Sequence, residues 1–300
     1  PDHIQQQDPH ELRRYVKALA ATRYRSLELL DALSSACVRQ ADSFSPGEFA
    51  DIGSQLATLH GGTPSFWSTF ASRMEKDWES LSDVKRMTAI STLILKAPEK
   101  VPQSFDSLAM VAYGGSRAYE RAVQCLIALG RYIPQAQDSA YRRLTQGQTT
   151  QALYDHEVDF MRNLPAQIGV PPVSIYAQVI VGGFETDFVV DFGHRRLIIE
   201  LDGASHFLAG PDGGMLQGRD EFQDIIFRRL GYEVVHVPLG GPSYINQKSA
   251  HNKPSLQSVV EALKREALDP NTVPRTYLER LTPYNWGNNN TWSGEDSDLP

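Results

Sequence analysis

The chain has 300 residues, of which 41% are hydrophobic and 22% charged, and its formal net charge is −7 at pH 7. These values are typical of a globular chain with one large or two ordinary domains, and they exclude a largely disordered one. The negative net charge gives no general support for nucleic-acid binding, for which a basic surface is expected. No apolar run approaches the roughly 20 residues that a membrane-spanning helix needs. Only Cys37 and Cys125 occur, which argues against a disulfide framework and predicts a reducing compartment.

Residues 8 to about 148 carry helical patterns that restart at a regular spacing. Asp8 opens the first, because an aspartate cap is followed by a proline and, three residues on, by a glutamate. The same chemistry returns at Ser45, and a third start follows at Ser82, so the spacing is 37 residues in both cases. A period of this length built from paired helices is typical of an α-solenoid, although an irregular helical bundle gives a similar pattern.

A polar stretch at residues 145–150 ends the helical region. The sequence therefore predicts a helical repeat domain over 1–148, an α/β domain over 149–268 and a polar C-terminal arm over 269–300. The α/β domain is expected to contain a helix at 151–164, strands at 174–181, 184–192 and 197–201, a helix at 219–230 and a strand at 232–238. Gly182-Gly183 predicts a hairpin between the first two strands, and the apolar third strand is expected to be central.

The C-terminal arm contains two tryptophans, Trp286 and Trp292, which are unusual in a linker. Asparagine, glycine, serine and acidic residues dominate the arm, so it cannot form a core by itself. The tryptophans can anchor either on a partner or back on the α/β domain, and the sequence does not decide between the two.

Acidic residues stand at the ends of two predicted buried strands, where ionised carboxylates need a partner. Asp191 ends the second strand, and Glu200 and Asp202 end the third. This arrangement resembles the core of PD-(D/E)xK nucleases, in which an aspartate and a glutamate on adjacent strands hold a divalent cation, usually Mg²⁺. The resemblance implies Asp191 and Glu200 as metal ligands, and Asp191, Glu200, Asp202 and Glu157 as the catalytic residues of an active nuclease. Asp202 stands where the family has a lysine that positions or activates the attacking water.

Two longer motifs give a closer resemblance. Residues 200–207 read ELDGASHF and residues 231–238 read GYEVVHVP, with a glycine-containing gap and a helix between them. They resemble the hallmarks of the RAP domain, an acidic-Asp-Gly-x-x-His-Phe segment and a Gly-aromatic-x-Val-Val-x-x-Pro strand. RAP domains typically follow helical repeats, as in the FAST-kinase-domain and octotricopeptide repeat proteins. The usual aromatic-x-x-Trp after the final proline is replaced here by Leu239-Gly-Gly-Pro.

The resemblance implies an α-helical, solenoid-like N-terminal domain followed by an α/β, restriction-endonuclease-like RAP domain. It also implies an RNA-binding protein of the mitochondrial matrix, or of plastids, that acts as a ribonucleoprotein or mitoribosome component or assembly factor. The expected partners are ribosomal RNA or an organellar transcript and other proteins of the assembly, with no membrane and no cofactor. The expected RNA-binding residues are Arg195, Arg196, His206, Arg219, Arg228 and Arg229.

We predict RNA binding without catalysis, and two other functions stay open. One is a nuclease for RNA processing with Mg²⁺ as its cofactor, and the other is a non-catalytic protein scaffold. For the acidic residues, the alternative to a metal site is a carboxylate network that fixes the loop after the third strand, with Asp202 capping the turn at Gly203. His206 can be a general acid, an RNA contact or simply the hydrogen-bond partner of an acid.

Overall fold

The computed structural model describes residues 3–102, 105, 117–132, 174–191, 196–238 and 291–293. Contacts divide the chain into two compact units. The first contains the described residues up to Tyr132 together with Ala204–Gln223, and the second contains those of 174–203, 224–238 and 291–293. The predicted domain boundary near residue 148 lies outside the described residues.

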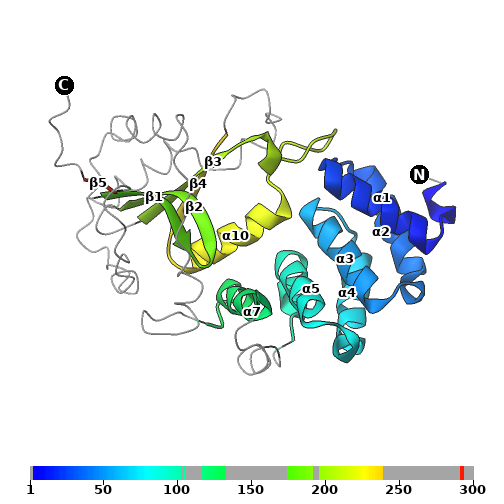
Figure 1. Cartoon of the computed structure of the whole chain (residues 1–300). Helices are drawn as coiled ribbons and strands as arrows, with labels where there is room; N and C mark the ends of the chain where they lie inside the picture. The colour runs from blue at the N-terminus through cyan, green and yellow to red at the C-terminus, as the bar shows by residue number, and fades with distance from the viewer. Residues whose placement is uncertain are drawn as a thin grey trace. The chain divides into compact units, whose positions relative to one another are not determined.

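The first unit is helical up to Tyr132 (Figure 1). Its α-helices and short 3₁₀ helices (η) are η1 (Ile4–Gln6), α1 (Pro9–Thr22), α2 (Leu27–Arg39), η2 (Ala41–Ser43), α3 (Pro46–Thr58), α4 (Pro64–Lys76), η3 (Trp78–Ser80), α5 (Asp83–Lys96), η4 (Pro98–Lys100) and α7 (Arg117–Ala128). Among the described residues, no helix is both long enough and apolar enough to cross a membrane.

Capping residues mark where these helices begin. Asp8 caps α1, because its carboxylate accepts a hydrogen bond from the Glu11 backbone N–H at 2.9 Å. Ser45 and Glu48 form a reciprocal capping box at the start of α3. Ser82 precedes α5, although its side chain makes no capping hydrogen bond. The three predicted starts are therefore the observed starts of α1, α3 and α5.

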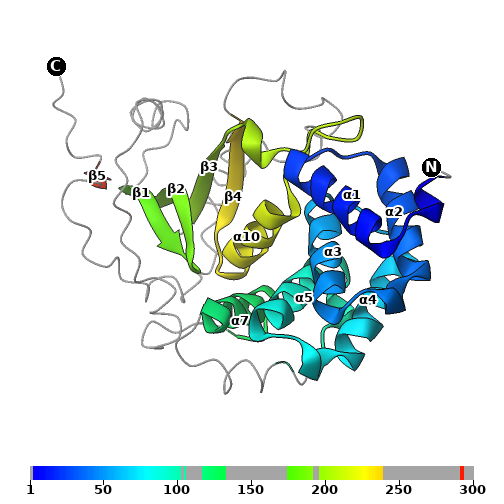
Figure 2. The ribbon, with the colours of Figure 1, turned by 45° about the vertical axis from the view of Figure 1, so that its right-hand side comes forward.

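The helices of the first unit pack in two rows, which Figure 2 shows from the side. Helix α3 contacts α1 and α5, α5 also contacts α7, and α2 contacts α4. Between α3 and α4, the rings of Phe49, Phe66 and Phe70 lie 5.6 to 6.0 Å apart. A Cβ atom on Gly53 would overlap the Phe70 ring, so this glycine permits the close approach of the two helices. Apolar packing of this kind, rather than helix propensity alone, stabilises the unit.

The second unit is built on a mixed sheet with the strand order β4-β3-β2-β1-β5. Its strands are β1 (Ser174–Val181), β2 (Phe184–Asp191), β3 (Arg196–Asp202), β4 (Glu233–Pro238) and β5 (Thr291–Ser293). Strands β1, β2 and β3 are antiparallel neighbours, whereas β4 is parallel to β3. A parallel neighbour requires a crossover, and η5 (Ala204–His206) and helix α10 (Gly218–Arg229) lie in that connection.

The sheet confirms two local predictions. Gly182 and Gly183 form the turn between β1 and β2, with φ values of +58° and +84° that other residues rarely adopt. Residues 197–199 of β3 are fully buried, as expected for a central strand.

The C-terminal arm returns to this sheet. Strand β5 pairs antiparallel with β1, and Trp292 lies opposite Ile175 in the register. Residues 291–293 of the arm therefore pair with the α/β unit of the same chain, which is one of the two alternatives for the tail. Trp286 lies outside the described residues.

Candidate functional site

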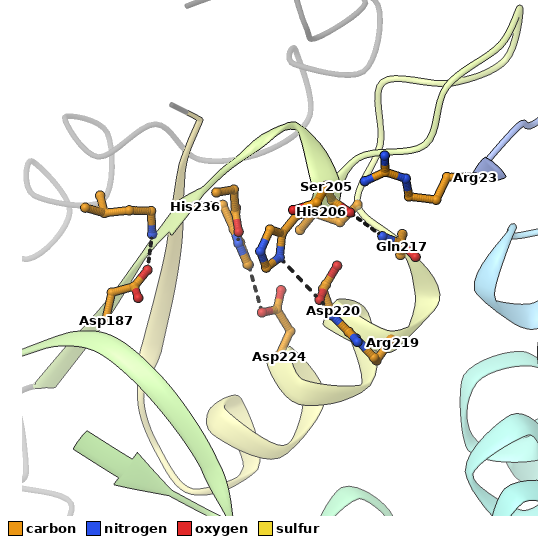
Figure 3. A network of polar contacts seen from close by, with 12 residues as sticks. Arg23, Asp187, Ser205, His206, Gln217, Arg219, Asp220, Asp224 and His236 are labelled. Carbon is orange, nitrogen blue, oxygen red and sulfur yellow. Dashed lines mark hydrogen bonds and ion pairs between the residues drawn. The ribbon is translucent and has the colours of Figure 1, made fainter. Parts of the chain in front are cut away.

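A buried polar cluster joins the ends of β3 and β4 to helix α10. His236 on β4 lies between two carboxylates: its Nδ1 is 2.6 Å from Asp202 Oδ2, and its Nε2 is 2.8 Å from Asp224 Oδ1. Asp202 is the last residue of β3, and Asp224 lies on α10, facing His236 (Figure 3). The side chains of Asp202 and Asp224 are 2% and 4% exposed. The cluster therefore links three elements through hydrogen bonds that water hardly reaches.

Both ring nitrogens of His236 face a carboxylate oxygen, so both must donate a hydrogen bond. Only the imidazolium form can do so, because a neutral imidazole carries one N–H. Burial by itself lowers the pKa of His236, but the hydrogen bonds and charges of Asp202 and Asp224 outweigh it and raise the pKa to about 9. The cluster is thus a cation held between two anions, a closed ionic network.

Glu200 is a carboxyl group of this region in which one of the two oxygen atoms lacks a hydrogen-bond partner among the described residues. Its Oε1 is buried and has no hydrogen-bond partner among the described residues. Burial raises its pKa well above the usual value, and the negative charges of Asp187, Asp202 and Asp224 add to the rise, partly offset by His236. The protonated form of Glu200 is therefore favoured, since its neighbours are mostly acidic.

The strand register places a different aspartate beside Glu200 from the one predicted. Phe188 of β2 pairs with Ile199 of β3, so the next antiparallel position brings Asp187 opposite Glu200. Asp187 also accepts a hydrogen bond from the Leu201 backbone N–H at 2.5 Å. Asp191 lies four residues along β2, about 13 Å away at the usual rise per residue. The structure therefore does not bring Asp191 and Glu200 together.

Asp191 has a partner of its own at the far end of the β2–β3 ladder. Its Oδ2 is 2.9 Å from Arg196 Nε, and the two residues are paired in the register. Their side chains are 14% and 20% exposed, so this is a largely buried ion pair. A carboxylate engaged in this way supports the hairpin rather than a metal site beside Glu200.

Two of the other predicted catalytic and metal-binding residues, Glu200 and Asp202, lie in the part of the chain that the structure describes. Among the described residues, no group of three or more histidine, cysteine, aspartate or glutamate side chains is arranged to hold a metal ion. The positions of the carboxylates give a reason, since Asp202 and Asp224 face His236 and Asp187 faces a backbone N–H. The predicted helix residue Glu157 lies outside the described residues.

The predicted RNA-binding residues fall into two groups. Arg196 is paired with Asp191, and Arg228 Nη2 is 2.9 Å from Asp224 Oδ2, so both arginines have an acidic partner. Arg219 and Arg229 are exposed on α10, and His206 is half-exposed. Arg195 lies outside the described residues.

The segment between β3 and α10 packs on the helices of the first unit. The backbone of Ala209 exchanges hydrogen bonds with the chain after α1: its N–H donates to Arg23 O at 2.8 Å, and its carbonyl accepts from Arg25 N at 2.7 Å. Arg25 also donates from Nε to Leu59 O at 3.0 Å and from Nη1 to Asp212 O at 2.5 Å. These bonds explain why contacts assign Ala204–Gln223 to the helical unit.

His60 makes a second attachment of the same segment. Its Nε2 is 2.7 Å from Leu216 O, and its Nδ1 is 3.1 Å from Lys96 Nζ and 3.3 Å from Glu221 Oε2. Burial and the positive charge of Lys96 lower the pKa of His60, against the opposing charge of Glu221. The ring is therefore neutral. Its Nε2–H donates a hydrogen bond to the Leu216 carbonyl, and its Nδ1 accepts one from Lys96 Nζ.

Three residues around Glu200 and Asp202 were not among the predicted site residues: Asp187, Asp224 and His236. Asp224 stands among the apolar residues of a helix, and His236 interrupts an apolar strand, so their unusual surroundings were the available signal. Nothing in the sequence distinguishes Asp187 from Asp191, which both flank the apolar core of β2. No protein-family model matches the chain, and no curated protein matches it.

Proposed function

We propose that this chain is a non-catalytic RNA-binding protein of the RAP-domain class. In this proposal it acts in the mitochondrial matrix as a ribonucleoprotein or mitoribosome component or assembly factor. The support is the pair of RAP-like motifs on β3 and β4, joined to a helical unit, and the closed state of the nuclease-like position between them. Cell fractionation of the native protein tests the location, and exclusive recovery in the cytosol would contradict it.

We infer that the helical unit is a solenoid of repeats. Helices α1, α3 and α5 begin at positions 9, 46 and 83, and α2 and α4 begin at 27 and 64, so both sets recur every 37 residues. The contacts of α3 with both α1 and α5 are those of a repeat with its two neighbours. A solenoid offers an extended surface that can follow a flexible RNA strand.

The main observation in favour of a non-catalytic role is the environment of Asp202. In the nuclease family the corresponding position is a lysine near the attacking water, whereas Asp202 is 2% exposed and bonded to a charged histidine. His236 is in turn bonded to Asp224. The three groups satisfy one another, which supports a structural role in which the motif fixes β3, β4 and α10.

Ultraviolet cross-linking of the full chain to a labelled single-stranded RNA, with Mg²⁺ present, tests this proposal. We expect an RNA adduct that unlabelled RNA competes away, and intact RNA after prolonged incubation. The absence of an adduct would overturn RNA binding and leave the protein scaffold as the function. Cleavage that follows the added Mg²⁺ would overturn the non-catalytic part.

A second candidate, a metal-dependent nuclease, is favoured by the unpartnered Oε1 of Glu200 next to Asp187. Hard carboxylate oxygens suit Mg²⁺, which would lower the pKa of a bound water, so Asp187 and Glu200 would be the ligands in place of Asp191. Cleavage of single-stranded RNA in Mg²⁺ or Mn²⁺ should then be lost in Asp187→Asn and Glu200→Gln. Equal residual cleavage in both variants would identify a contaminant and exclude this candidate.

A further inference from the structure

A surface group of basic residues lies where the segment after β3 packs on the end of α1. Arg23 caps the C-terminal end of α1 in a left-handed conformation, with φ of +55°. This conformation is uncommon for a residue with a side chain. It is fixed because Arg23 O accepts a hydrogen bond from Ala209 N at 2.8 Å. The guanidinium makes one long hydrogen bond, from Nη1 to Ala204 O at 3.4 Å, so it is placed beside η5 with donors to spare.

Arg219 stands close to the same loop, in the first turn of α10. Its side chain is 73% exposed, and its nearest acidic group is the adjacent Asp220, with Nε 3.8 Å from Oδ1. A cation in the first turn faces the positive end of the helix dipole, so the helix itself gives no reason for an arginine here. A Cβ atom on Gly218 would overlap Ala57 O, which means that the helix start is held tightly against α3.

His206 and Ser205 complete the group. His206 Nδ1 is 3.5 Å from Asp220 Oδ1, and the Asp220 side chain is only 7% exposed. Gln217 holds this turn, because its Nε2 donates to Ser205 O at 2.5 Å and its backbone N–H donates to His206 O at 3.0 Å. Figure 3 shows Arg23 on one side of the His206–Asp220 pair and Arg219 on the other. The basic side chains therefore come from the end of α1, from η5 and from the first turn of α10, and the acidic Asp220 beside them is buried.

The neighbouring acidic residues are engaged elsewhere. Glu221 faces the buried Lys96, whose pKa its negative charge raises against the effect of burial, and Asp212 accepts a hydrogen bond from the Leu27 N–H at 2.7 Å. The half-buried Arg23 and the exposed Arg219 thus stand next to this loop, although the whole chain is acidic. Guanidinium groups are well matched to phosphate oxygens, and phosphate contacts position a protein on a nucleic acid.

We propose that Arg23 and Arg219, on either side of Ser205 and His206, form a clamp for the phosphodiester backbone of single-stranded RNA. This proposal rests on the proposed RNA-binding function and deepens it, because it assigns the contact to a loop shared by the helical unit and the RAP-like motif. Arg23, outside that motif, is a required part of the site. Two neighbouring phosphates of one strand are the ligand, rather than a free phosphate group.

Fluorescence anisotropy of a labelled single-stranded RNA, titrated with the full chain at several salt concentrations, tests the clamp. We expect Arg23→Ala and Arg219→Ala each to weaken binding about fivefold to tenfold. Each should also reduce the slope of log affinity against log salt by about 0.7, the value for one lost phosphate contact on a single strand. Arg23→Lys and Arg219→Lys should keep most of the slope. The matched control is Arg14→Ala, an exposed arginine of α1 paired with Glu11 at 2.9 Å, which should bind as the wild type does.

Four results would overturn the clamp. One is wild-type binding by Arg23→Ala and Arg219→Ala with unchanged melting temperatures, which leaves the RNA-binding function standing. A second is an equal loss in Arg14→Ala, which means a diffuse charge effect. A third is displacement of the RNA by millimolar inorganic phosphate or uridine monophosphate, which means a site for one phosphate group. The fourth is absence of RNA binding by the wild type, which overturns the proposed function together with the clamp.

Discussion

Two buried histidines, one in each unit, have opposite charge states. The imidazoles of His60 and His236 are both 11% exposed, and burial alone lowers the pKa of each. His236 lies between two carboxylates, which raise its pKa to about 9. His60 lies beside Lys96, and its pKa stays lowered. The neighbours, rather than the burial, therefore decide whether a buried histidine is charged.

The difference determines what each histidine contributes to the fold. His60 is a neutral donor to one carbonyl, so its loss leaves an unsatisfied oxygen. His236 lies within hydrogen-bonding distance of both Asp202 and Asp224, and the more exposed Arg228 also lies 2.9 Å from Asp224. Removing a buried counter-charge costs more than removing a neutral hydrogen bond.

The largest effect is expected for His236→Ala. This change removes the cation that lies between two buried carboxylates, so the free energy of unfolding at pH 7 should fall by about 3–5 kcal/mol. His60→Ala should cost about 1–3 kcal/mol, the penalty of one unsatisfied buried group. Urea unfolding of both variants measures the difference. Arg228→Ala, which removes an exposed partner of the same Asp224, should cost less than about 1 kcal/mol. Equal losses in the two histidine variants would contradict the different charge states of His60 and His236.

The pH dependence of stability should separate the two histidines next. The folded pKa of His236, about 9, lies above the unfolded value of 6.5. Its contribution is therefore fully present below pH 6.5 and is lost as the pH rises to 9, which amounts to about 3 kcal/mol.

His60 has the opposite sign, because its folded pKa is lowered below 6.5. Its contribution is present above pH 6.5 and is lost as the pH falls toward the folded pKa. Chemical unfolding between pH 5 and pH 9 should show a flatter alkaline limb in His236→Ala than in the wild type and a flatter acidic limb in His60→Ala. The reverse assignment, or unchanged limbs, would contradict these charge states.

The smallest expected effect concerns the neighbour of His60. Lys96→Met removes the charge that, after burial, does most to lower the pKa of His60, and it keeps a side chain of similar length. Nuclear magnetic resonance titration of the imidazole should then show a higher pKa for His60 and an unchanged pKa for His236. A pKa that does not move would mean that burial alone controls His60.

Local signals explain how much of the fold could be predicted. The cap at Asp8, the capping box at Ser45 and the two-glycine turn at Gly182 act within a few residues, so each was readable from the sequence. The site was only partly predictable. Glu200 and Asp202 were recognised from their place at the end of an apolar strand, but the choice of Asp187 over Asp191 as the neighbour of Glu200 required the register. That Asp202 faces a charged histidine could not be predicted, because it depends on β4 lying beside β3.

The sequence by itself determined the helix starts, their 37-residue spacing, the hairpin and the central position of β3. Tertiary structure alone decided that Asp187 lies opposite Glu200, that Asp202 is closed by His236, and that Asp212 binds the N–H of Leu27, 185 residues earlier in the chain. Turns and caps depend on neighbouring residues and so leave a pattern. Register and long-range hydrogen bonds depend on which surfaces pack together, and a single sequence carries no local signal for that.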